Sequence, residues 1–214
     1  MTQKNDLIGI FGGTFDPVHN GHLRVALEAI EQVRLREVRF VPNHRPSHRA
    51  PPVATVTERL RMLHLAIEPP LCIDDSEVKR GGVSYMVETL ELLREKHPST
   101  ALCLILGRDA FENLSTWYRA EAVLKLAHVI VASRGGLGLR QREDVVEGFV
   151  GGRYCKDAMD LRKTASGRVF LMDIPLLPIS SSDLRDRLGR GLSVRHLVPE
   201  SIETFITKIY AKEQ

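Results

Sequence analysis

The chain has 214 residues, of which 43% are hydrophobic and 27% charged, and its formal net charge at pH 7 is +3. This is ordinary globular usage, and the length can bury one core, so we expect a single domain over residues 1–214. A charge of +3 is too small to indicate a nucleic-acid partner, and three cysteines do not make a disulfide framework. We expect no secretory signal, and no apolar run approaches the length of a membrane span. The sequence therefore predicts a cytoplasmic protein without a membrane partner.

The most informative segment follows an apolar run near the N-terminus. Gly12 and Gly13 end that run, a polar turn carries His19 and His22, and a helical pattern covers 22–35. Glycines let the backbone approach an anion closely, and the start of a helix offers unpaired N–H groups to phosphate. Two imidazoles on one helical face can donate hydrogen bonds to a phosphorus centre that becomes pentacoordinate. The order of strand, loop and helix therefore predicts a polyphosphate site.

Other interpretations of the two histidines stay open at this point. The loop lacks both the dinucleotide fingerprint and the Lys-Ser/Thr ending of a P-loop. His19 and His22 could hold a metal, for which Asp16 is the only neighbouring third ligand, or could simply pack or cap the helix.

Strand and helix patterns alternate along the chain. Apolar runs rich in Ile, Leu and Val predict strands at Leu7–Phe11, Glu37–Val41, Leu71–Asp74, Ala101–Leu106, His128–Ala132 and Arg168–Met172. Helical patterns lie near 56–67, 84–97 and 118–126, and Thr55 with Glu58 forms a capping box. We therefore expect an α/β fold with a Rossmann-like, doubly wound parallel sheet.

Two regions interrupt this alternation. Residues 42–52 contain four prolines and cannot be regular structure, so we expect a loop that is mobile without ligand. Residues 134–167 look like an insertion before the last strand.

Polar and aromatic residues follow the fourth predicted strand. Asp109 could accept hydrogen bonds from a ribose or could cap the next helix. Trp117 and Tyr118 could stack on a ligand ring or fill the core.

The C-terminal region predicts a small helical part over about 179–214. Ser180, Ser181 and Ser182 can cap a helix that carries Arg185 one turn in, and the same groups can surround phosphates. A packing helix is expected from Pro199 to Tyr210.

Two of these segments carry a family resemblance. His19-Asn20-Gly21-His22, behind Gly12-Gly13-Thr14-Phe15-Asp16-Pro17, matches a His-x-Gly-His signature, and Ile179–Arg185 matches Ile-Ser-Ser-x-x-x-Arg. Together they resemble the nucleotidylyl transferase superfamily, and the whole chain resembles its bacterial nicotinate-nucleotide adenylyltransferase family.

The resemblance implies an enzyme of NAD biosynthesis that transfers AMP from MgATP to nicotinate mononucleotide, giving deamido-NAD and pyrophosphate. Mg²⁺ would be bound with ATP, and no metal site made of protein ligands is expected. A same-fold enzyme for nicotinamide mononucleotide or phosphopantetheine and a non-catalytic nucleotide sensor are the alternatives. Oligomeric state stays undecided.

The family's site residues transfer onto matching positions of this chain. They are His19 and His22 for catalysis; Gly12, Gly13, Thr14, Phe15, Gly107, Asp109, Arg134, Ser180, Ser181 and Arg185 for ATP; and Asn43, Arg49, Tyr85, Met86, Trp117 and Tyr118 for the mononucleotide. Arg49 stands where many relatives have Lys, so its positive charge is kept. Met86 departs from the usual Thr, so we expect the preference for acid over amide to depend more on backbone donors.

Overall fold

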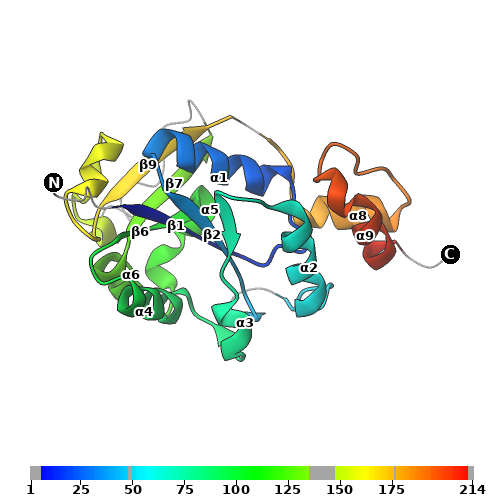
Figure 1. Ribbon diagram of the computed structural model, residues 1–214, viewed down its shortest axis with the longest axis horizontal. Coiled ribbons are helices and arrows are strands. Elements are labelled where there is room, and N and C mark those ends of the chain that lie inside the picture. Colours follow the sequence, from blue (N-terminus) through cyan, green and yellow to red (C-terminus); the bar gives the residue numbers. More distant parts are fainter. Residues whose placement is uncertain (1–5, 48–49, 135–147, 176, 212–214) are drawn as a thin grey trace.

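The structure, a computed structural model, describes residues 6–47, 50–134, 148–175 and 177–211. A central sheet of seven parallel strands has the order β4-β2-β1-β6-β7-β9-β8 (Figure 1). Its strands are β1 (Leu7–Gly13), β2 (Glu37–Pro42), β4 (Leu71–Ile73), β6 (Ala101–Gly107), β7 (His128–Arg134), β8 (Tyr154–Cys155) and β9 (Val169–Ile174). The doubly wound parallel sheet is therefore confirmed.

Helices cover both faces of this sheet. Figure 1 shows α1 on one face and α4 and α6 on the other. The helical elements are α1 (Asn20–Val33), α2 (Val56–Ala66), α3 (Ser76–Arg80), α4 (Met86–Lys96), α5 (Arg108–Glu112), η1 (Leu114–Thr116), α6 (Ala120–Leu126), η2 (Ala158–Arg162), α8 (Ser181–Gly189) and α9 (Glu200–Tyr210).

The side chains of β1 contribute to two hydrophobic cores, one on each face of the sheet. Leu7 and Phe11 belong to the core shared with α1 and the C-terminal helices, whereas Ile8 and Ile10 belong to the core under α4 and α6. Because side chains of a strand point alternately to opposite faces, a strand covered on both sides needs apolar residues at every position. This requirement explains the nearly continuous apolar runs of the sequence.

The sheet reverses its winding between β1 and β6. Their pairing runs from Leu7 opposite Ala101 to Ile10 opposite Leu104. Beyond that point each strand continues beside its outer neighbour, β1 to Gly13 and β6 to Gly107. The two carboxyl ends thus separate at the switch point, the place where ligands bind in open α/β sheets.

The prediction that 42–52 contains no regular structure was wrong. Arg45–Pro46 forms β3, which pairs with β5 (Val83–Ser84) in a two-stranded parallel sheet. The His44 N–H also donates to Ser84 Oγ at 2.9 Å. A two-residue strand leaves no periodicity in the sequence, and Pro46 supplies no N–H, so only the tertiary pairing reveals this element.

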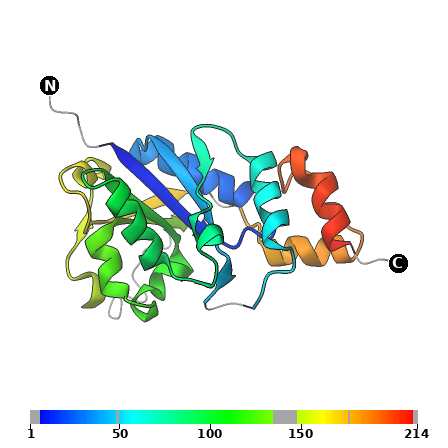
Figure 2. The same ribbon diagram turned by 60° about the horizontal axis from the view of Figure 1, so that its bottom comes forward.

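The C-terminal helices form a separate flank beside α2 (Figures 1 and 2). The packing helix expected from Pro199 to Tyr210 is present as α9, which begins after Pro199 and buries Ile202, Ile206 and Tyr210. Arg61 of α2 lies 4.6 Å from the ring centroid of Phe205. Of the helices in the described ranges, none combines the length and apolar character that crossing a bilayer requires.

Candidate active site

The loop after β1 is held in an unusual backbone conformation. Gly12 and Gly13 end the strand, and Phe15 has a φ of 53°, a left-handed value that costs free energy for a bulky residue. The Phe15 ring is buried against Phe11, Phe40 and His22, with ring centroids 5.1 to 5.9 Å away. The Phe15 side chain is therefore a packing anchor and is not exposed to bind a ligand.

The two candidate catalytic histidines lie face to face. His19 is the N-cap of α1, and its ring stacks on that of His22 with centroids 3.7 Å apart. His19 is 5% exposed, and burial lowers its pKa to about 4. Within the part of the chain that the structure describes, its buried Nδ1 has no hydrogen-bond partner. A neutral imidazole with an unused ring nitrogen at a helix start is suited to donate to, or accept from, a bound ligand.

Asp16 is not available as a third ligand beside the histidines. Its carboxylate accepts hydrogen bonds from the backbone N–H groups of Val53 and Ala54, at 2.9 and 3.0 Å, and from the Tyr210 hydroxyl. Asp16 is 4% exposed. It therefore ties two distant segments, residues 53–54 and the end of α9, to the loop after β1 instead of serving as the metal ligand that the sequence left open.

The C-terminal motif contacts this same loop. Ser180 caps α8 by accepting from Asp183 N, and Ser181 donates to the Pro17 carbonyl at 2.9 Å. Arg185 donates to the Asp16 carbonyl at 2.6 Å and stays partly exposed. The Ile179–Arg185 segment is thus hydrogen-bonded directly to the loop before His19, although the two are far apart in sequence. The Arg185 guanidinium keeps further N–H groups that could donate to phosphate oxygens.

Asn43 and Thr14 connect the ends of β1 and β2. Asn43 N donates to the Gly13 carbonyl and Asn43 Nδ2 to Thr14 Oγ1, each at 3.0 Å. The predicted ATP loop and the predicted mononucleotide segment are therefore neighbours.

Two of the aromatic residues predicted to bind the mononucleotide lie together at the start of α4. Tyr85 is the N-cap of α4, and its ring centroid lies 4.6 Å from that of Tyr118. Trp117 packs partly against the core under α4 and α6, as does Tyr85. The Met86 side chain extends to the carboxyl end of β1, where its Cε would lie 2.3 Å from a Cβ placed on Gly12.

The strand ends across the switch point supply the remaining residues. Gly107 is the N-cap of α5, which removes the capping interpretation of Asp109; the exposed Asp109 lies in the first turn instead. Arg134 ends β7 opposite Ile174, and only its backbone is described. Arg49 lies outside the described residues, as does most of the first half of the 134–167 region.

Comparisons with known proteins agree with this geometry. The profile of the cytidylyltransferase-like family matches residues 10–187. A probable nicotinate-nucleotide adenylyltransferase of Methylococcus capsulatus is 41% identical over 96% of this chain and 100% of its own length. One from Dictyoglomus turgidum is 40% identical, with 96% of each chain covered. The chain belongs to the nicotinate-nucleotide adenylyltransferase family. Membership makes it a nucleotidyltransferase.

A solved structure of this family confirms the fold. The nicotinic acid mononucleotide adenylyltransferase of Plasmodium falciparum, complexed with NaAD, superposes with a TM-score of 0.70. It is 20% identical and covers 95% of this chain and 96% of its own, so the likeness concerns the fold alone.

One buried residue near the site lies outside the family motifs and was not predicted from the sequence. Arg59 of α2 is 1% exposed and donates to the carbonyls of Thr14 and Asn43, each at 2.8 Å. A signal existed, because Arg59 precedes Met62 and Leu63 by three and four residues and so shares their buried helix face.

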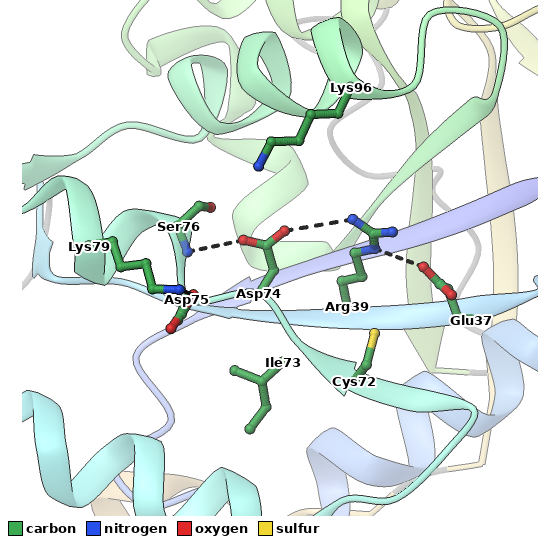
Figure 3. A pocket seen from close by; sticks show the side chains of 9 residues that line it. All are labelled: Glu37, Arg39, Cys72, Ile73, Asp74, Asp75, Ser76, Lys79 and Lys96. Carbon is green, nitrogen blue, oxygen red and sulfur yellow. Dashed lines mark hydrogen bonds and ion pairs between the residues drawn. The ribbon is translucent and has the colours of Figure 1, made fainter.

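A hollow of about 400 Å³ lies elsewhere, between β2, β4, α3 and the end of α4 (Figure 3). Most of its charged side chains are paired: Arg39 contacts Glu37 at 2.8 Å and Asp74 at 3.8 Å, and Lys79 contacts Asp75. Its lining contains none of the site residues of the family, so we do not assign the nucleotide to it.

Proposed function

We propose that this chain transfers AMP from MgATP to nicotinate mononucleotide, releasing pyrophosphate and forming deamido-NAD. The observation that carries the proposal is the stacked His19–His22 pair, which follows the two glycines at the end of β1. The loop between the glycines and the histidines is hydrogen-bonded to the Ile179–Arg185 motif. The relatives that align over nearly the whole chain bear this activity in their names.

In this mechanism the phosphate of the mononucleotide attacks the α-phosphorus of ATP in line, and the P–O bond to pyrophosphate breaks. The attacking phosphate is already ionised at neutral pH, so the chain needs to supply position and charge stabilisation rather than a nucleophile. His19 and His22 hold the α-phosphate, and Gly12 and Gly13 let the backbone approach it. Because burial lowers the pKa of His19 to about 4, His19 acts as a neutral imidazole near pH 7.

The leaving pyrophosphate is bound at the start of α8. The remaining donors of Arg185 and the N-terminal N–H groups of α8 face the loop that Ser181 joins at Pro17. Ser180 acts mainly as the helix cap here, because its hydroxyl oxygen already accepts from Asp183 N.

Mg²⁺ enters as part of the substrate MgATP and neutralises charge on the phosphate oxygens. Asp16, the acid closest to the histidines in sequence, is occupied by Val53, Ala54 and Tyr210. Phosphate oxygens and water therefore fit as the main ligands of the ion.

The acceptor binds between the end of β2 and the start of α4. Asn43 at one side, and Tyr85, Trp117 and Tyr118 at the other, offer a polar contact and aromatic rings for a pyridine ring. Met86 takes the place where a hydroxyl contact would be expected, so recognition of the carboxylate depends on backbone N–H groups.

Label transfer tests the reaction. With ATP labelled at the α-phosphorus and nicotinate mononucleotide, the label should move into the dinucleotide, and a γ-label should leave in pyrophosphate. Label found in free AMP, or on the protein after denaturation, would contradict direct transfer to this acceptor. A His22→Ala sample processed in parallel controls for contaminating activity.

A further inference from the structure

Arg59 is a buried cation with a set of backbone partners. Its side chain lies on the buried face of α2 and is 1% exposed, so it cannot reach a substrate directly. Nη1 donates to the Thr14 carbonyl at 2.8 Å and lies 3.4 Å from Asn43 Oδ1. Nη2 donates to the Asn43 carbonyl at 2.8 Å and lies 3.4 Å from the His44 carbonyl. The planar fork thus spans two loops that come from different strands.

Those two loops carry the two substrates of the proposed reaction. Thr14 lies between the glycines and the catalytic histidines, and Asn43 directly follows β2 at the acceptor side. Direct bonds between them, from Asn43 to the Gly13 carbonyl and to Thr14 Oγ1, fix one point of contact. The Arg59 guanidinium adds a second connection, through the Thr14 and Asn43 carbonyls. Two connections fix the position of one loop relative to the other.

The surroundings of Arg59 make this arrangement costly for the fold. Burial lowers the pKa of Arg59, while the nearby Asp16 carboxylate opposes that shift. A buried charge with partners is often no more stabilising than apolar residues of the same volume. A role in geometry therefore accounts better for a guanidinium here than stability alone does.

We propose that Arg59 is a positioning residue for the adenylyl transfer, setting the distance between the α-phosphate site and the acceptor phosphate through Thr14 and Asn43. This assignment rests on the proposed function. Since a displacement of about 1 Å can cost roughly 10²-fold in rate, a clamp between two substrate loops has a measurable effect on turnover.

Arg94 provides a matched control. It is also a part-buried arginine that joins loops through carbonyls, donating to Thr100 and Leu126 at 2.6 Å and to His97 and Ala165 at 3.0 Å. These contacts lie before β6 and β7, at the opposite end of the sheet from the site. Arg94→Lys should therefore lower the melting temperature without changing kcat per folded molecule.

The test compares Arg59→Lys, Arg59→Gln and Arg94→Lys. Arg59→Lys keeps the positive charge but has a single side-chain nitrogen, whereas Arg59→Gln removes the buried charge. The two variants therefore perturb folding in different ways, but both lose the planar guanidinium that bonds to two loops at once. We expect kcat with nicotinate mononucleotide and MgATP to fall about 10²-fold per folded molecule in both Arg59 variants. Amide hydrogen exchange without ligand should rise in segments 12–17 and 40–46 together.

Arg59→Lys with kcat within twofold of wild type would overturn the proposal, because a point charge would then suffice. Loss of kcat in Arg94→Lys to the same degree would overturn it as well, since the effect would be general destabilisation. A wild-type chain that makes no dinucleotide would overturn the proposed function instead, so the two failures are distinguishable.

Discussion

The methyl end of Met86 lies against Gly12. A Cβ added to Gly12 would come within 2.3 Å of Met86 Cε, closer than real side chains approach. Met86 begins α4, and Gly12 lies near the carboxyl end of β1. The residue that departs from the family's usual Thr thus contacts the end of β1 with its side chain.

This contact predicts coupling between positions 12 and 86. Gly12→Ala should push the Met86 side chain aside and lower kcat/KM, whereas the shorter side chain of Met86→Thr leaves room for the added methyl. The double variant should therefore retain more activity than the product of the single effects, with a coupling free energy of about 0.5–3 kcal/mol. Steady-state kinetics of the four proteins measure it, and strictly additive effects would contradict the contact.

Removing the His22 ring should affect chemistry far more than folding. We expect His22→Ala to lower kcat by about 10²–10³-fold, the typical loss when one donor to a transition-state charge is removed. The exposed His64 on α2 is the matched control, and His64→Ala should keep its kcat. Thermal unfolding of each variant separates the two effects. A His22→Ala protein that keeps most of its turnover would remove the catalytic assignment.

The buried His19 predicts a pH dependence of stability. Its pKa is about 4 in the folded protein and 6.5 in a free histidine, so the unfolded chain binds the extra proton first as pH falls. The contribution of neutral His19 to the free energy of unfolding is therefore fully present above about pH 6.5. It declines as the pH falls toward 4, by up to about 3 kcal/mol. Urea unfolding of wild type and His19→Gln across this window checks it. Parallel curves for the two proteins would contradict a buried, neutral His19.

The Tyr210 hydroxyl predicts a stability effect from the C-terminal helix. Tyr210→Phe leaves the buried Asp16 carboxylate with one donor fewer and should cost about 1–3 kcal/mol in the free energy of unfolding. Thr207→Ala removes an exposed bond on the same helix and should change the free energy by less than about 0.5 kcal/mol. Denaturant unfolding compares them; equal effects would show that Asp16 does not need this donor.

Particular residues show why part of the fold and site was predictable. Leu7 on one face of β1 and Ile8 with Ile10 on the other signal a strand buried on both sides, and the spacing of His19 and His22 brings both rings together at the start of α1. Both signals are local, since each depends on residues a few positions apart.

The missed features depend on contacts that are distant in sequence. Arg59 looks like one more surface charge until Thr14 and Asn43 are placed beside it, and Asp16 looks like a free carboxylate until Tyr210 reaches it. The pairing of β3 with β5 likewise involves only two residues on each side. The single-domain organisation and the roles of individual site residues stay predictions, and so does the cytoplasmic location.

The central claim is the choice of acceptor, and pyrophosphate release with MgATP measures it most directly. Nicotinate mononucleotide, nicotinamide mononucleotide and phosphopantetheine would be offered separately to the wild-type protein, and kcat/KM compared. We predict a strong preference for nicotinate mononucleotide, which would also show that Met86 is compatible with recognition of the acid. Release of pyrophosphate only with another acceptor, or with none of the three, would contradict the proposed function while leaving the fold intact.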